Sequence, residues 1–334
     1  MKRSGKTVYF DSPPVISATS AMAGPVEGKG PLKDYFDKTI DDPYYKTKTF
    51  EKAERKLCGE NCQNLLTKAG LKPDQIDFLL AGDLLNQIVT ANFCARELKI
   101  PFIGLYGACS TAIEALSVGS MLIDGGFANQ IMAFASSHYQ TAERQYRMPI
   151  EYGSQYPPFK QWTVTGAGGF IISDKGTGPR ITHATIGQVL DFGVKNPKDM
   201  GSAMAPAAVD TIIQHLKDTN RTGDDYDLIV TGDLGEVGKV MARELLREQN
   251  YNLDLVLDDC GTMLYSDDQK TGAKGSGAAS SAIVLASYLY QKLQEGHLNR
   301  IMVAGTGALL SPITSLQGES IPGIAHCITI ENSG

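Results

Sequence analysis

Residues 104–116 read GLYGACSTAIEAL, and this stretch decides the fold class. The apolar run 101–105 predicts a buried strand that breaks at the two glycines, and the small residues that follow predict a helix over about 110–125. Cys109 therefore lies at a strand-to-helix turn, where the free N–H groups of the helix start favour a thiolate, an oxyanion or a bound carboxylate. This position indicates a nucleophile or an anion site, although a free cysteine in an apolar region is more often buried and inert.

The composition is that of an ordinary globular protein, with 334 residues, of which 20% are charged and 42% hydrophobic. A net charge of −6 gives no general support for a nucleic-acid partner. The basic start MKRSGK is followed by TVYFD rather than by a long apolar core, so no signal peptide is predicted. No apolar run approaches the length that spans a bilayer. We therefore expect any membrane association to come through a partner.

Six cysteines are scattered through the chain, at positions 58, 62, 94, 109, 260 and 327. Cys58 and Cys62 are four residues apart on the apolar face of a predicted helix, which indicates core packing. No second Cys/His pair with zinc spacing follows, so no metal site is expected. A reduced, intracellular protein fits this pattern best.

The chain contains an internal duplication. Residues 74–84 (DQIDFLLAGDL) match residues 224–234 (DDYDLIVTGDL). Two further blocks match in the same order, and they pair 108–113 with 278–283 and 129–135 with 299–305. Matched blocks in one order indicate two copies of one α/β unit, which we place at 1–175 and 176–334.

Each copy alternates helices with continuously apolar strands, as in a layered α/β protein with parallel strands covered on both faces. The helices are predicted near 49–69, 110–125, 203–219, 237–249 and 278–295. The strands are predicted near 77–81, 101–105, 130–135, 227–231, 254–257 and 300–305. Between the copies, 161–173 and 180–189 look like two paired strands joined by the turn DKGTGP.

The two copies differ at Cys109, which corresponds to Ala279, and this asymmetry favours a function for the sulfur in the first copy. With ACSTA at a strand-to-helix turn, the glycine-rich GAGGF at 166–170 and GSGAAS at 275–280, the chain resembles the thiolase and β-ketoacyl synthase superfamily over nearly its whole length. The resemblance implies a thiolase-like α/β fold in which two duplicated βαβαβ-type halves form α-β-α-β-α layers.

Within that superfamily, 12–16, 30–37, 107–111 and 136–139 resemble the AD family of stage V sporulation proteins from spore-forming bacteria. That resemblance implies binding of dipicolinic acid, with or without calcium, for uptake into the developing spore and release on germination. It also implies a homodimer and other stage V sporulation membrane proteins as partners, at the inner membrane of the forespore or spore. It implies no cofactor.

The chain departs from the condensing enzymes of the superfamily. Where the resemblance leads us to expect a histidine after the strand at 228–230, the chain has Asp233, and where type III synthases carry Asn it has Ser276. Asp233 has a twin in Asp83, which favours a structural role such as helix capping for both. We therefore expect a binding protein without condensing activity. The alternatives are acyl transfer through acyl-Cys109 with His138 as base, and a scaffold that needs no ligand.

A dicarboxylate ligand requires hydrogen-bond donors, positive charge and an apolar slot for its ring. His138 follows a strand end next to the Cys109 strand, so both side chains could open onto one side of the sheet, and a protonated His138 would donate from both ring nitrogens. The segment 139–158 could form a lid or a partner surface. The predicted ligand-binding residues are Cys109, Ser110, Thr111, His138, Arg144, Arg147, Asp233 and Ser276.

Overall fold

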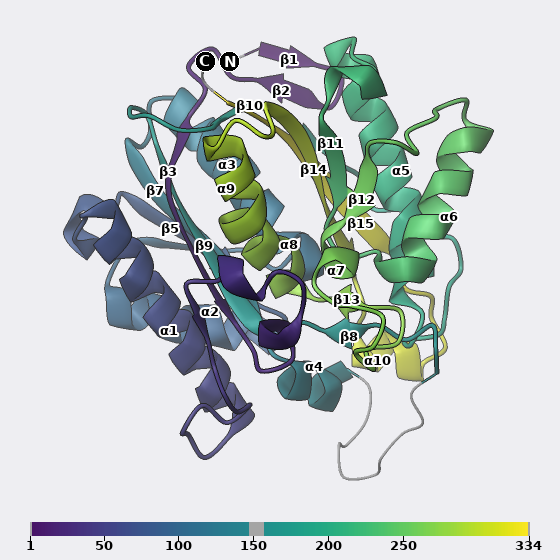
Figure 1. The fold of residues 1–334 in the computed structure, drawn as a ribbon, viewed down its shortest axis with the longest axis horizontal. Coiled ribbons are helices and arrows are strands. Elements are labelled where there is room, and N and C mark those ends of the chain that lie inside the picture. The colour runs from purple at the N-terminus through teal and green to yellow at the C-terminus, as the bar shows by residue number, and fades with distance from the viewer. Residues whose placement is uncertain (1, 147–156, 333–334) are drawn as a thin grey trace.

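The computed structural model describes residues 2–146 and 157–332, which form two similar half-sheets joined edge to edge (Figure 1). The strand order is β12-β11-β14-β15-β10-β3-β9-β7-β5-β6, and β10 meets β3 through only the pair Arg180–Val15. The first half contains β3 (Val15–Ala23), β5 (Phe78–Gly82), β6 (Phe102–Gly104), β7 (Gln130–Ser137) and β9 (Gly166–Ser173). The second contains β10 (Arg180–Ile186), β11 (Leu228–Thr231), β12 (Leu257–Asp259), β14 (Arg300–Ala308) and β15 (Gly323–Glu331).

The halves repeat one pairing pattern, which confirms the predicted duplication. In each half three strands are parallel and two further strands are antiparallel to their neighbours. Asp77 and Asp227 occupy matching positions, and each carboxylate accepts two backbone N–H groups at the start of the neighbouring strand, β7 or β14. The boundary at 175/176 stays a prediction.

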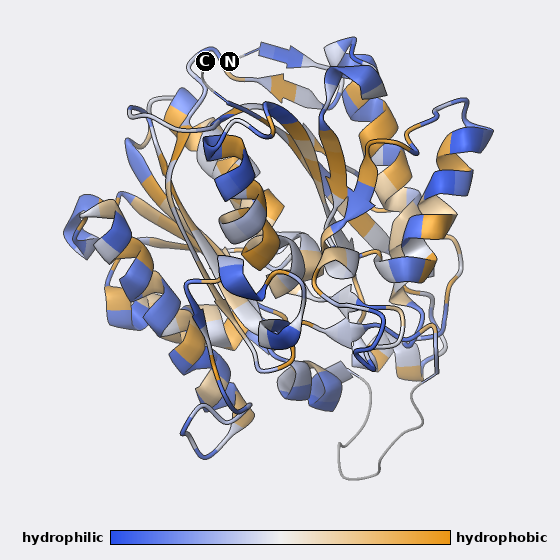
Figure 2. Cartoon of the chain, viewed as in Figure 1, coloured by the Kyte–Doolittle hydropathy of each residue, from blue (hydrophilic) through white to orange (hydrophobic). Residues whose placement is uncertain are grey.

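The helices form three layers around the half-sheets, so the fold is α-β-α-β-α (Figure 1). The two outer layers are α1 (Phe50–Ala69) with α2 (Val89–Leu98), and α5 (Met200–Thr219) with α6 (Gly235–Glu248). Between the half-sheets lie α3 (Thr111–Asp124), α8 (Ala278–Val284) and α9 (Tyr290–Gln294), the last two joined by a π-helical turn. Shorter helices are α4 (Tyr139–Tyr146), α7 (Cys260–Met263) and α10 (Pro312–Leu316). Figure 2 shows polar residues concentrated on the outer faces of α1 and α6.

Local sequence explains the ends of the outer helices. The Thr49 hydroxyl accepts the Lys52 N–H at the start of α1, and Gly70 ends that helix with φ +65°. Asp199 and Asn220 play the same roles for α5. Cys58 and Cys62 are buried between α1 and its half-sheet, as predicted.

Two strand predictions are wrong. The segments 161–173 and 180–189 are not paired with each other, because β9 lies between β3 and β7 while β10 pairs with β15. The turn between them carries the chain from one half-sheet to the other, so each strand finds its long partners in its own half. The strand expected at 254–257 is β12, at Leu257–Asp259.

Shorter strands complete the sheets. β1 (Lys2–Ser4) pairs with β2 (Thr7–Tyr9), which pairs in turn with β10. β4 (Lys38–Thr39) pairs with β3, and β8 (Trp162–Thr163) pairs with β13 (Gly275–Ser276). Within 2–146 and 157–332, no helix combines the length and apolar character needed to cross a bilayer.

Two glycines differ in the space around them, and we expect opposite effects on stability when each is changed to alanine. A Cβ atom at Gly168 would lie 2.3 Å from the carbonyl carbon of Ala282 in α8, whereas a Cβ at Gly59 in α1 would meet nothing closer than 3.9 Å. Gly168→Ala should therefore lower the free energy of unfolding by about 1–3 kcal/mol, through overpacking. Gly59→Ala should raise it by about 0.5–1 kcal/mol, through helix propensity. Urea unfolding followed by circular dichroism measures both, and equal effects would contradict the close packing of β9 on α8.

Candidate functional site

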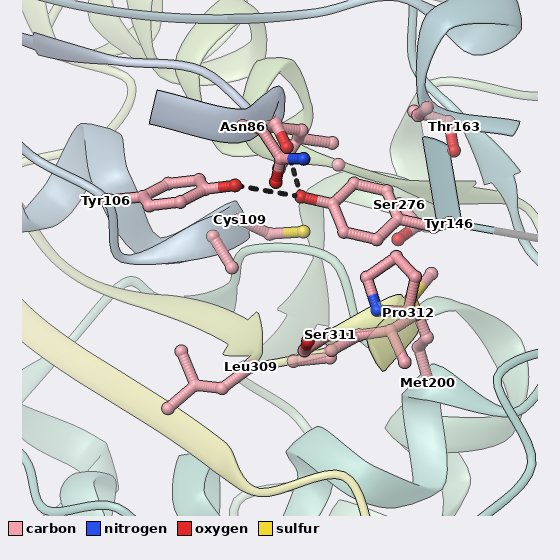
Figure 3. A pocket seen from close by; sticks show the side chains of 16 residues that line it. Asn86, Tyr106, Cys109, Tyr146, Thr163, Met200, Ser276, Leu309, Ser311 and Pro312 are labelled. Atoms are coloured by element: carbon pink, nitrogen blue, oxygen red, sulfur yellow. Dashed lines mark hydrogen bonds between the residues drawn. The ribbon is translucent and has the colours of Figure 1, made fainter. Parts of the chain in front are cut away.

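A cavity of about 280 Å³ lies at the end of the parallel strands, where the two halves meet (Figure 3). Its wall combines aromatic and aliphatic side chains with a few neutral polar groups. The lining residues are Leu84, Asn86, Tyr106, Ala108, Cys109, Ala142, Tyr146, Thr163, Met200, Ser276, Gly277, Ala308, Leu309, Leu310, Ser311 and Pro312. None of these described lining residues carries a charge, so the described wall supplies the expected apolar slot and hydrogen-bond donors but not the expected positive charge.

Cys109 lies in the predicted strand-to-helix turn, directly before α3, and its side chain faces the cavity. Ala108 in this turn has φ +53°, a left-handed conformation that costs a residue with a Cβ atom about 1–2 kcal/mol. The hydroxyls of Ser110 and Thr111 each donate at 2.7 Å to carbonyls of the same turn, those of Gly107 and Ala108. These two predicted ligand-binding residues therefore stabilise the turn and do not line the cavity.

Asp233 lies behind the cavity wall and organises it. Its carboxylate accepts the Thr306 hydroxyl at 2.6 Å, the Gly277 N–H at 2.8 Å and the Ser276 hydroxyl at 3.1 Å. Burial raises the pKa of this carboxyl, and its hydrogen bonds oppose that shift. The structure thus brings together three of the predicted residues, Cys109, Asp233 and Ser276.

The helix-capping role predicted for both Asp83 and Asp233 is confirmed for Asp83 only. The Asp83 carboxylate accepts the Leu85 N–H at 2.9 Å and the Ala91 N–H, in the first turn of α2, at 2.8 Å. In the second half, Asp259 accepts the Leu234 and Gly235 N–H groups at the start of α6. Because Asp259 satisfies that helix start, the Asp233 carboxylate is available to the cavity wall.

The electrostatics of the site keep the Cys109 thiol protonated. Burial raises its pKa well above the ordinary value, and the neighbouring Asp233 carboxylate raises it further. The nearby donor groups of Gly277 and Ser276 oppose this shift and do not overcome it. The expectation that the helix start favours a thiolate here is therefore wrong, because burial and a nearby negative charge outweigh the helix dipole.

His138 does not open onto the cavity, contrary to the prediction. Side chains alternate along β7, so Ser137 points to α8, where its hydroxyl accepts the Ala279 N–H, while His138 points to α1. The His138 Nε2 lies 2.9 Å from the Pro43 carbonyl oxygen, and the ring lies 5.7 Å from that of Phe50. Burial lowers the pKa of His138 to about 4, so the side chain is neutral near pH 7.

The predicted arginines do not contribute to the described cavity either. Arg144 in α4 pairs with Glu51 at 2.9 Å, and both side chains are largely exposed. Arg147 and half of the segment 139–158, predicted as a lid, lie outside the described residues. All five histidines lie within the described ranges, and none lines the described wall.

Sequence reasoning missed the aromatic wall and the far side of the cavity. Tyr106 and Tyr146 approach each other through their hydroxyls, 3.4 Å apart, and Tyr146 donates to the Leu84 carbonyl (Figure 3). Residues 308–312 line the far side of the cavity at the end of β14, and the repeat that pairs 129–135 with 299–305 matches them to 138–142, of which Ala142 lines the near side. The duplication was therefore a usable signal for the far side of the cavity.

Removal of the Asp233 charge should make Cys109 more reactive. Asp233→Asn eliminates the charge that helps to raise the thiol pKa, so Cys109 should react faster with iodoacetamide at pH 8, by about tenfold for each unit by which the pKa falls towards that pH. Mass spectrometry of the Cys109 peptide over time measures the rate, and Asp83→Asn is the matched control. An unchanged rate in Asp233→Asn would show that Asp233 does not control the thiol.

Comparison with known proteins identifies the family of the chain. The family model described as Stage V sporulation protein AD (SpoVAD) matches residues 4–331. Stage V sporulation protein AD of Bacillus subtilis is 51% identical over 335 residues, which cover 100% of this chain and 99% of that protein.

Solved structures share the fold at low sequence identity. Xanthomonas campestris OleA with bound cerulenin is 10% identical with a TM-score of 0.62, covering 97% of this chain and 100% of that one. The 3-oxoacyl-[acyl-carrier-protein] synthase III of Aquifex aeolicus is 14% identical with a TM-score of 0.57, covering 95% and 99%. The fold is thus that of the thiolase-like condensing enzymes, and the chain belongs to the stage V sporulation protein AD family.

Proposed function

We propose that this sporulation protein binds dipicolinic acid in the cavity at Cys109 and takes part in its uptake into the developing spore with other stage V sporulation membrane proteins. The observation that carries the proposal is a small, partly aromatic cavity whose cysteine is held protonated. At about 280 Å³ the cavity is at the lower end of the range for small-molecule sites. That volume suits a compact ring better than a long acyl chain.

The charge distribution suggests how such a ligand would lie. Asp233 places negative charge behind Cys109 and Ser276, so a carboxylate of the ligand would be repelled from this wall. Asn86 is exposed and Tyr106 is 50% exposed, which places neutral hydrogen-bond donors towards solvent. We infer that the ring faces Cys109 and that the carboxylates face Asn86, Tyr106 and Ser311. This orientation reverses the expectation that the carboxylates bind at the start of α3.

The acyl-transfer alternative has less support. A nucleophilic cysteine requires a base or a lowered pKa, whereas burial and the neighbouring Asp233 raise the pKa of the Cys109 thiol. His138, the base in that alternative, faces α1 instead of the cavity.

Filling the cavity should abolish dipicolinate binding. Ala308→Phe places a ring in the cavity and should remove the heat of binding in calorimetric titration, while Asn86→Ala should weaken binding about tenfold by removing a hydrogen bond to a charged group.

Arg144→Gln is the matched control, because Arg144 pairs with Glu51 away from the described cavity wall, and its affinity should equal that of the parent. Circular dichroism checks that each variant is folded. No binding by the parent, or unchanged binding by Ala308→Phe, would contradict the proposal.

We also propose a homodimer that pairs through the edge strand β6, which is hydrogen-bonded only to β5 among the described strands. Ile103 in this strand is 38% exposed, and unpaired strand edges are ready sites for pairing with another chain. Ile103→Lys should therefore yield monomers in size-exclusion chromatography with light scattering.

Leu255→Lys is the control, because Leu255 is fully exposed next to β12 at the opposite end of the sheet. A monomeric parent, or dissociation by Leu255→Lys instead, would exclude the β6 interface.

A further inference from the structure

The segment 44–52, called here the basic loop, joins an exposed aromatic ring to three exposed lysines. Tyr44 is 45% exposed, and its ring stacks on Phe50 at 4.3 Å. Lys46, Lys48 and Lys52 are exposed, and none of them forms an ion pair with a residue in 2–146 or 157–332. This local positive charge contrasts with the net charge of −6 of the whole chain.

Contacts beneath the basic loop anchor its backbone to neighbouring elements. Tyr45 and Lys46 have φ +47° and +57°, so the backbone turns sharply through two left-handed residues. The buried Tyr45 ring makes this turn possible, because its hydroxyl donates to Glu60 and accepts from Lys38 at 2.6 Å. His138 lies 2.9 Å from the Pro43 carbonyl oxygen just before the loop.

The acidic groups around the loop are mostly engaged elsewhere. Glu51 pairs with Arg144, and Glu60 pairs with Lys38. Asp42 accepts the Tyr44 N–H at 2.9 Å, while Asp41 remains exposed beside it. The lysines therefore present a positive surface that local carboxylates neutralise only in part.

The loop lies at the same end of the molecule as the elements that line the cavity. Figure 1 shows the loop that leads into α1, together with α4 and α10, towards the lower edge of the molecule. On α10, Pro312 lines the cavity, while Ile313 and Leu316 are 70% and 90% exposed.

We propose that the basic loop binds an anionic phospholipid bilayer directly. Lysines are attracted to anionic headgroups, and tyrosine is enriched at the boundary between headgroups and acyl chains. This combination at an exposed turn fits a lipid surface better than an acidic protein segment, which requires no exposed aromatic ring. The proposal goes beyond dipicolinate binding and does not depend on it. It replaces the expectation that membrane contact comes only through partners.

Vesicle flotation tests the proposal without any ligand. At about 0.1 M salt the protein should float with vesicles of equimolar phosphatidylglycerol and phosphatidylcholine and not with phosphatidylcholine alone, and it should be released at about 1 M salt, where screening shortens the range of charge interactions. The combined variant Lys46→Gln, Lys48→Gln, Lys52→Gln should bind about a hundredfold more weakly, since each lysine near the surface contributes roughly fivefold. Tyr44→Ser should weaken binding further.

The matched control is the combined variant Lys2→Gln, Lys175→Gln, Lys217→Gln. It changes the net charge equally at three exposed lysines outside the basic loop, and its binding should equal that of the parent. Failure of the parent to float with anionic vesicles would overturn the proposal and favour an acidic protein partner. An equal loss in both combined variants would also overturn it, because net charge rather than the basic loop would then govern binding.

Discussion

The site depends on the close approach of two backbones in the central layer. A Cβ atom at Gly307 in β14 would lie 2.7 Å from the Gly107 carbonyl oxygen, and one at Gly305 would lie 2.6 Å from Ile113 in α3. These contacts press the turn of the first half onto a strand of the second half. Cys109 is thereby placed next to Asp233, although 124 positions separate them in the sequence. A larger residue at either glycine would separate the two halves where the cavity forms.

The buried Asp233 carboxylate decides what chemistry this placement allows. An unpaired buried carboxylate would be costly, but three hydrogen bonds from Thr306, Gly277 and Ser276 satisfy it. The same carboxylate, together with burial, raises the pKa of the Cys109 thiol and opposes thiolate formation. The cysteine at the start of α3 is thereby kept as a neutral thiol on the wall of the cavity.

The duplication and the layered α/β class were predictable because they rest on repeated apolar strands and turn signals. The order of the layers was predicted from the family resemblance instead. Side-chain direction was harder to predict. Ser137 and His138 are adjacent polar residues at the end of β7. Because neighbouring side chains of a strand point to opposite faces, Ser137 faces α8 whereas His138 faces α1. Arg144 was predicted to bind a ligand carboxylate, but it pairs with Glu51 of α1, a contact between helices that the sequence pattern does not reveal. The turn at 174–179 has hairpin chemistry, but longer partners elsewhere determine how β9 and β10 pair. Of the eight predicted ligand-binding residues, two line the described cavity, Cys109 and Ser276, and Asp233 lies behind its wall. Ser110, Thr111, His138 and Arg144 do not line that wall.

The pairing of β2 with β10 has a consequence for the order of folding during synthesis. Thr7, Val8 and Tyr9 lie opposite Thr185, Ala184 and His183. The first strands to leave the ribosome therefore wait for more than half of the chain before they find their partner. The first half-sheet, in contrast, is complete once Ser173 has emerged. Pairing between strands far apart in the sequence forms late, because the entropy cost of closing the long loop is paid before the contacts between the strands can offset it. The amino terminus is therefore made first but cannot be ordered before β10, the first strand of the second half-sheet, has been made.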